Sequence, residues 1–275
     1  MRRWPIAILL LASACQQKAQ QATTPAELTF DGAQVSEVAA VRAHGERLTH
    51  VLGCTGCHGA KLEGTFFTED EPQNGPLYAS NLTIQVPKFT DAQLEGILRT
   101  GVHPDRKTVW AMPSEVFQNL SAADMNALIA YLRTLKPSGK PTPLPQFSAQ
   151  DRKDIAAGNY KPAVERVKDF RKAQPIDLGL EYAFGRYITS VTCEECHGSS
   201  LTGDLAGQVK TPNLIVAGGY SRANFERLIT QGIPTPYRKL NPMMSGVART
   251  RFSRLTPHER DALYAYLRAR AEQPQ

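Results

Sequence analysis

Apolar residues recur at helical spacing in two stretches of the chain, 121–136 and 256–270. One helical face collects Met125, Leu128, Ile129 and Leu132 in the first stretch, and Leu263, Tyr266 and Leu267 in the second. Residues 130–133 and 265–268 both read Ala-Tyr-Leu-Arg. Because residues three and four apart share one face of a helix, the pattern predicts the same amphipathic helix twice.

Capping signals mark where other helices begin and end. Thr90 and Gln93 form a capping box, and the helix that they open reaches about position 100, where Gly101 closes it. Ser221 and Gly232 bound a matching helix in the second half of the chain. Residues 35–51 are also predicted to be helical.

The two terminal helices carry start signals as well. Ser121 precedes Asp124 by three positions. Thr256 is followed by Pro257 at the first helical position and by Glu259 three residues on, which is a fuller start signal.

A short apolar run near the N-terminus predicts an export signal over residues 1–15. Arg2 and Arg3 precede the run 6–12, and small residues follow it. The run is too short to span a bilayer stably. Residues 11–15 resemble a bacterial lipobox, so we expect Cys15 to be lipidated, the protein to be periplasmic, and residues 16–34 to form a flexible tether. The alternative is ordinary cleavage nearby, which would leave Cys15 as a spare thiol.

Two pentapeptides carry the candidate chemistry. Residues 54–58 read Cys-Thr-Gly-Cys-His and residues 193–197 read Cys-Glu-Glu-Cys-His, so each has the pattern C-x-x-C-H that attaches haem c. Two thiols on one helical turn can add to the two vinyl groups of one haem, and the next histidine then lies under the iron. The sequence therefore predicts two haem c groups, bound covalently by Cys54, Cys57, Cys193 and Cys196 and ligated by His58 and His197.

Two other chemistries could use the cysteine pairs. A thioredoxin-like redox pair needs no histidine directly after it, yet both copies have one. A zinc site could combine both pairs, but this would leave the matching neighbourhoods of the two motifs unexplained.

The frames around the motifs coincide, which indicates an internal repeat. After each histidine come six residues with glycine first and last, 59–64 and 198–203, and later an Asn-Leu pair at 81–82 and at 213–214. With these features the chain resembles a di-haem c-type cytochrome over residues 35–136 and 176–270. The resemblance implies an all-α fold of two tandem cytochrome c domains, each a few helices around one haem.

The resemblance also implies how each histidine is oriented. In the family, the carbonyl group before the Asn accepts a hydrogen bond from the other nitrogen of the haem-ligating histidine. Carried over to this chain, the acceptors are the backbone carbonyls of Ser80 and Pro212, and such a bond fixes ring orientation and ligand basicity.

The distal ligands are expected to be methionines. The loop 110–113 reads Trp-Ala-Met-Pro and lies where the family places its distal methionine, so Met112 is predicted to bind the first iron. In the second copy, an equal count from the helix-closing glycine favours Met243, whereas a small residue after the ligand favours Met244. We expect Met244 to bind the second iron and Met243 to be the alternative.

Composition changes this picture little. The chain has 275 residues and a formal charge of +6, which becomes +4 without the two leader arginines. Two domains of about 100 residues are small for a core of side chains alone, so each haem is expected to serve as part of the core. No dense basic patch is interleaved with aromatic residues, which argues against nucleic-acid binding.

A connector separates the two copies. Its first part is rich in proline, and residues 148–175 are charged and expected to be partly helical, with breaks at Gly158 and Pro162. We interpret residues 137–175 as a linker and a strap between domains; the alternative for the strap is a partner-binding surface.

A histidine and a methionine on each iron leave no coordination position open, so the expected function is outer-sphere electron transfer and not enzymatic turnover. The resemblance implies a periplasmic carrier between a redox protein donor, such as a dehydrogenase, and the respiratory chain, with no small-molecule substrate. The lipobox-like residues add the expectation of a membrane anchor at Cys15. The alternative is a di-haem peroxidase or a haem enzyme that oxidises sulfur compounds, which would need a vacant or displaceable distal position.

Overall fold

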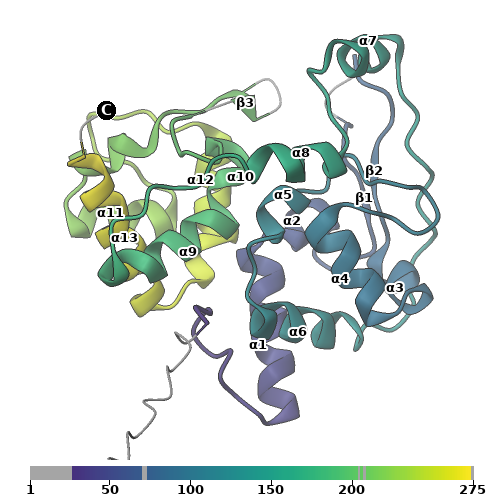
Figure 1. The fold of residues 1–275 in the computed structure, drawn as a ribbon, viewed down its shortest axis with the longest axis horizontal. Coiled ribbons are helices and arrows are strands. Elements are labelled where there is room, and N and C mark those ends of the chain that lie inside the picture. The colour runs from purple at the N-terminus through teal and green to yellow at the C-terminus, as the bar shows by residue number, and fades with distance from the viewer. Residues whose placement is uncertain (1–26, 70–72, 204, 207–208, 274–275) are drawn as a thin grey trace, which may run out of the picture.

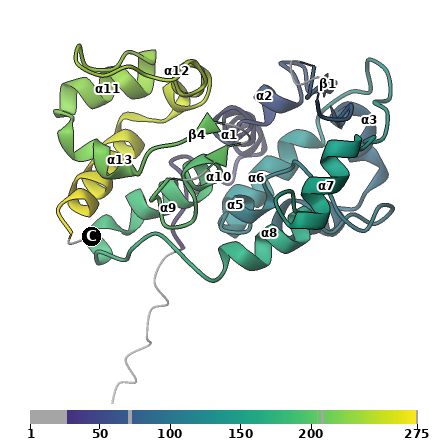
Figure 2. The same cartoon turned by 90° about the horizontal axis from the view of Figure 1, so that it is seen from above.

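The helices form two groups that lie side by side in both views (Figure 1 and Figure 2). The computed structural model describes residues 27–69, 73–203, 205–206 and 209–273. The proposed export signal, Cys15 and most of the tether lie outside the described residues. No helix in the described part has the length and apolar character needed to cross a membrane.

The first repeat contains six α-helices, one 3-10 helix and a two-stranded antiparallel hairpin in its described residues. The helices are α1 (Val38–Val51), α2 (Cys54–Cys57), α3 (Leu82–Gln85), η1 (Val86–Lys88), α4 (Asp91–Thr100), α5 (Ser114–Phe117) and α6 (Ala122–Leu132), and the strands are β1 (Thr65–Phe66) and β2 (Tyr78–Ala79).

The second repeat follows the same order. Its elements are η2 (Leu180–Tyr182), α9 (Ala183–Thr192), α10 (Glu194–His197), β3 (Leu205–Ala206), β4 (Val209–Lys210), η3 (Leu214–Gly219), α11 (Arg222–Gln231), α12 (Pro242–Thr250), η4 (Phe252–Arg254) and α13 (Pro257–Ala271). The fold is all-α apart from these two small hairpins, which the sequence did not predict.

The helix boundaries follow the predicted caps. Thr90 and Gln93 form the expected capping box, and a second box joins Thr256 to Glu259. Gly101 and Gly232 close α4 and α11 with φ of +69° and +67°, in the left-handed region that glycine adopts at little cost. The first helix begins at Val38, three residues later than predicted, because Glu37 caps it by accepting from two backbone N–H groups.

In both repeats the first and last helices cross at a glycine. A Cβ atom on Gly45 would lie 2.0 Å from the Ala127 carbonyl oxygen, and one on Gly185 would lie 2.1 Å from that of Ala262. Because any side chain would clash there, glycine lets α1 pack directly on α6 and α9 on α13. The apolar faces predicted for the terminal helices lie in the hydrophobic core, where Met125 and Leu263 are fully buried.

The strap has two helices, α7 (Ala149–Ala157) and α8 (Ala163–Phe170), that lie against the first repeat. Gly158 ends α7 and Pro162 precedes α8, as the sequence predicted. Helix α8 packs on α5 and α4, beside which it appears in Figure 1. The strap therefore covers the segment that carries Met112.

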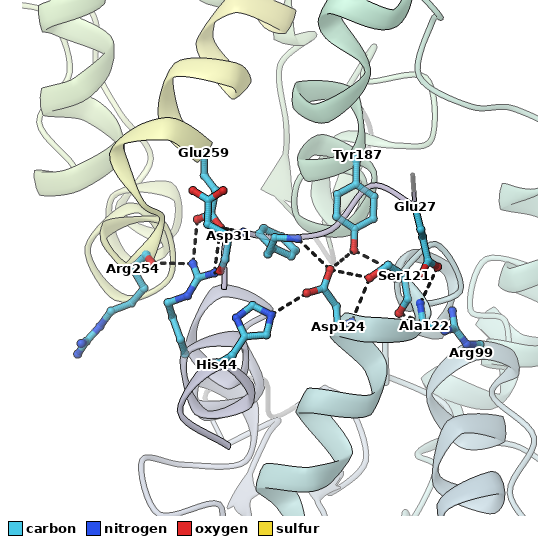
Figure 3. A network of polar contacts seen from close by, with 12 residues as sticks. Glu27, Asp31, His44, Arg99, Ser121, Ala122, Asp124, Tyr187, Arg254 and Glu259 are labelled. Carbon is cyan, nitrogen blue, oxygen red and sulfur yellow. Dashed lines mark hydrogen bonds and ion pairs between the residues drawn. The ribbon is translucent and has the colours of Figure 1, made fainter. Parts of the chain in front are cut away.

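A buried polar network joins the two repeats (Figure 3). The Tyr187 hydroxyl of α9 donates to Asp124 of α6 at 2.7 Å, and the His44 ring of α1 bonds the same carboxylate at 2.7 Å. In the opposite direction, Arg47 of α1 makes two contacts with Glu259 of α13, at 2.8 and 2.9 Å.

These contacts are reciprocal. Arg47 and Tyr187 each stand two residues after the crossing glycine of their repeat, and Asp124 and Glu259 are each the third residue of a terminal helix. In each repeat, the side chain at this position donates to the carboxylate at the start of the last helix of the other repeat. The two contacts are therefore related as in a two-fold symmetric dimer. The relative position of the two CxxCH motifs is therefore fixed.

Candidate functional site

Each CxxCH motif forms one helical turn. Cys54 to Cys57 make up α2, and the His58 N–H donates to the Cys54 carbonyl at 2.8 Å. In the second copy the His197 N–H donates to the Cys193 carbonyl at 2.9 Å. A turn of this kind puts the two thiols of a motif on one side and the histidine directly after them.

The four motif cysteines are free thiols, of which Cys54 and Cys193 are buried and Cys57 and Cys196 are partly buried. Burial raises the pKa of Cys54 to about 12 and the pKa values of Cys193 and Cys196 to about 11. Redox-active CxxC pairs depend on a lowered thiol pKa, so these thiols do not have the character of a thioredoxin-like pair.

A zinc site shared by the two cysteine pairs would need side chains of both motifs to converge. Among the described residues no three side chains of the types His, Cys, Asp and Glu converge as a metal cluster. Each pair instead stands with its own histidine in its own repeat.

Both motif histidines make the hydrogen bond expected from the sequence. Nδ1 of His58 lies 2.7 Å from the Ser80 carbonyl oxygen, and Nδ1 of His197 lies 2.9 Å from that of Pro212. Burial lowers the pKa of both rings, although each carbonyl acts in the opposite direction. The neutral ring with its proton on Nδ1 leaves the Nε2 lone pair free for a metal ion.

A strained leucine shapes each loop after the histidine. Leu62 and Leu201 have φ of +57° and +60°, which costs a non-glycine residue about 1 kcal/mol. Both side chains are buried, and their carbonyls accept from the N–H groups of Leu82 and Leu214 at 2.8 and 2.9 Å. The same strain and the same contact in both copies tie the motif to the Asn-Leu loop that orients the histidine.

In the first repeat, the predicted proximal and distal ligands share one cavity. Its volume is about 360 Å³ and its lining is mainly apolar. Cys54, Cys57, His58 and Met112 all line it. The apolar part of the lining includes Leu52, Leu82, Val86, Phe89, Leu98, Phe117 and Leu128.

An arginine from the strap holds the loop of Met112. Arg166 of α8 donates to the carbonyls of Trp110 at 2.6 Å and Met112 at 2.7 Å, and it pairs with Glu115 at 2.8 Å. Sequence reasoning missed this residue, because the contact spans more than fifty positions and no local motif marks it.

The second repeat has two methionines at the start of α12. Met243 is 49% exposed, and its backbone N–H donates to the Asn241 side chain. Met244 is partly buried and packs against the hydrophobic core. Met244 is therefore the better buried of the two methionines.

Glu194 is a second residue that sequence reasoning missed. It lies within the second CxxCH motif, its side chain is fully buried, and neither carboxylate oxygen has a hydrogen-bond partner among the described residues. Burial raises its pKa to about 9, opposed in part by Arg186. The carboxyl group is therefore protonated at neutral pH.

The residues of the first site fit haem c. A pair of buried thiols, an imidazole with a free Nε2 and a thioether line one apolar cavity, and these are the donors and the environment that a covalently bound haem requires. The second repeat reproduces the thiols and the oriented histidine.

Comparison with known proteins finds relatives among the components of dehydrogenases. The fructose dehydrogenase cytochrome subunit of Gluconobacter japonicus is 24% identical over 270 residues, which cover 86% of this chain and 55% of the relative. The cytochrome c subunit of alcohol dehydrogenase (quinone) from Gluconacetobacter polyoxogenes is 29% identical over 156 residues, 52% of this chain and 33% of the relative. A subunit of the nicotinate dehydrogenase of Pseudomonas putida is 25% identical over 199 residues, 66% of this chain and 16% of the relative. The chain thus spans about half or less of the length of these relatives.

The cytochrome c family model matches the chain twice, over residues 43–136 and 183–271. Each match contains one CxxCH turn, its oriented histidine and the crossing of the first and last helices. Together the two matches cover well over half of the chain, and the chain therefore belongs to the cytochrome c family.

Proposed function

We propose that this protein is a di-haem cytochrome c that accepts electrons from a dehydrogenase and passes them on to the respiratory chain. The observation that carries the proposal is the first cavity, which both His58 and Met112 line together with the two attachment cysteines. If both His58 and Met112 held the iron, no coordination position would be left for a substrate, and the centre would act as a carrier and not as an enzyme.

In this proposal His58 and Met112 would hold the iron of the first haem, and His197 and Met244 would hold that of the second. Haem c, when bound, supplies an iron that changes between the ferric and ferrous states. The Ser80 and Pro212 carbonyls hold the two imidazoles in place, and Arg166 binds the backbone carbonyl of Met112. Residues that are fixed in this way would be held in place in both oxidation states of a bound haem.

The dehydrogenase partner is inferred from the relatives, whose names describe subunits of nicotinate, fructose and alcohol dehydrogenases. The periplasmic location is inferred from the leader-like residues 1–15, and anchoring to a membrane from Cys15. An exported carrier fixed to a membrane surface would remain close to both a dehydrogenase and the respiratory chain.

The test begins with the spectrum of the purified holoprotein. We expect two covalently bound haems per chain, ferric spectra that are low-spin at both sites with the weak far-red band of methionine ligation, and no turnover of peroxide. A substantial high-spin fraction that binds cyanide would contradict the carrier and support a peroxidase.

The second part of the test measures electron delivery. The ferric holoprotein is mixed in a stopped-flow instrument with a purified dehydrogenase of each of the three named kinds and its substrate. We expect at least one of them to reduce both haems within its turnover time. Reduction no faster than that of an unrelated c-type cytochrome in all three cases would contradict the proposed partner class.

A further inference from the structure

The two CxxCH motifs are joined by one buried arginine. Arg251 follows α12, and its side chain is 11% exposed. Its Nε and Nη2 donate to the carbonyls of Val51 and Leu52 at 3.2 and 3.1 Å, and its Nη1 donates to Glu195 at 2.9 Å.

The partners of this arginine belong to the two attachment segments. Val51 is the last residue of α1, Leu52 follows it, and only Gly53 separates Leu52 from the first motif. Glu195 is one of the two residues between the cysteines of the second motif. A single guanidinium group therefore binds the chain next to both attachment sites at once.

The local backbone is shaped to admit the guanidinium. Gly53 has φ of +81°, and a Cβ atom at this position would lie 2.7 Å from Cζ of Arg251. A side chain at position 53 would thus meet both backbone strain and the arginine. The corresponding position before the second motif is Thr192, whose hydroxyl donates to the Ile188 carbonyl of its own helix.

The charges of this contact lie close to both sites. The Val51 and Leu52 carbonyls are at the C-terminal, negative end of the α1 dipole, which a cation stabilises. Glu195, although it belongs to the second repeat, lines the cavity of the first. The first repeat makes an uncharged contact with the segment before the second motif. There the Asn119 side-chain amide donates to the Ser190 carbonyl at 3.4 Å.

We propose that Arg251 is the positioning residue for electron exchange between the two haems: it fixes the two attachment segments against each other and places a buried positive charge beside both. This proposal rests on the function proposed above, since it assumes that both motifs carry haem. A positive charge favours the ferrous state, so Arg251 raises both reduction potentials and Glu195 lowers them.

The experiment titrates both reduction potentials of isolated full-length holoprotein with chemical mediators, and measures electron equilibration between the haems after rapid partial reduction. In Arg251→Gln we expect both potentials to shift to more negative values and equilibration to become slower. In Glu195→Gln we expect the opposite shift. Arg251→Lys retains the charge but not the three contacts, so its potentials should stay near those of the wild type while equilibration slows.

Arg47→Gln is the matched control, because it breaks another ion pair between the repeats, Arg47–Glu259, that touches neither attachment segment. We expect it to lower the unfolding temperature without moving either potential. If Arg251→Gln behaves in the same way, or if the Arg251 and Glu195 variants shift the potentials in the same direction, the proposal is wrong.

These outcomes are independent of the partner. If the potentials of the variants move as expected but no dehydrogenase reduces the protein, only the proposed function is wrong. If a dehydrogenase reduces the protein but the potentials of the variants stay unchanged, only the role of Arg251 is wrong.

Discussion

Met112 offers the sharpest test of the proposed ligation. In Met112→Ala we expect one reduction potential to fall, because a thioether ligand favours ferrous iron. The fall should be on the order of 0.1 V, a fraction of the roughly 0.8 V over which axial ligands set haem potentials. One haem should become high-spin while the covalent haem content stays at two per chain. If the spectrum and both potentials stay unchanged, Met112 is not the ligand.

Met243 and Met244 form a natural pair of matched variants. Met244 is packed against the core and Met243 is 49% exposed. We therefore expect Met244→Ala to create a high-spin haem and to lower one potential, and Met243→Ala to leave the optical spectrum unchanged. The reverse result would assign the ligand to Met243 and would mean that α12 begins differently when haem is bound.

Glu194 makes stability depend on pH in a direction that can be predicted. Its pKa is raised from 4.5 to about 9 by burial, so above pH 4.5 the unfolded chain releases a proton that the folded protein keeps. This favourable contribution is complete below pH 4.5 and is lost as the pH rises towards 9. At pH 7 the loss is on the order of 3 kcal/mol.

Glu194→Gln removes this titration and keeps the size of the side chain. We expect the urea midpoint of the variant holoprotein to exceed that of the wild type by an amount that grows steadily from pH 5 to pH 8. Midpoints of the two proteins that run parallel over this range would show that Glu194 does not keep its proton in the folded state.

The helix boundaries were predictable from the sequence wherever they depend on residues that lie close together in the chain. Thr90, Gln93 and Gly101 lie within about three helical turns of one another. The motif histidines bind carbonyls of a loop that recurs at the same place in both repeats. Arg166 and Arg251 were not predictable, because they bind backbone carbonyls 54 to 200 positions away. A carbonyl group has no signature in the sequence, so an arginine that will bind one looks like any surface arginine.

Helix α8 is expected to control the first haem through Arg166. In Arg166→Gln the contacts with Glu115 and with the loop carbonyls are lost, which should destabilise the protein by about 2 kcal/mol. The Met112 loop is then less restrained, so a high-spin fraction should appear on warming well below the unfolding temperature. Absorption spectra recorded between about 10 and about 40 °C, below the usual unfolding range of such domains, would detect it.

Lys168→Gln is the control for this experiment, because Lys168 lies exposed on the same helix. It should change neither the stability nor the spin state. Loss of stability in Arg166→Gln without any high-spin haem would mean that α8 supports the fold of the first repeat but not the ligation of its iron.

The reciprocal contacts between the repeats bear on how the protein unfolds. Tyr187 and Arg47 each bind a carboxylate of the other repeat at the N-terminus of its last helix, and Asp124 and Glu259 have fully buried side chains. Breaking one partner of a buried polar contact leaves the other group without compensation, which costs about 1–3 kcal/mol. Neither repeat can therefore open without exposing the interface of the other.

From this we expect the wild-type holoprotein to unfold in a single calorimetric transition. The double variant Tyr187→Phe, Arg47→Gln should unfold in two, because both directions of the contact are lost while each repeat keeps its own core and its own pair of crossing helices. Arg222→Gln, which breaks an ion pair with Asp261 inside the second repeat, should lower the temperature of that single transition slightly without splitting it. Two transitions in the wild type would mean that the repeats are thermodynamically independent, and the relative position of the two haem sites would then have to be maintained by Arg251 and the linker alone.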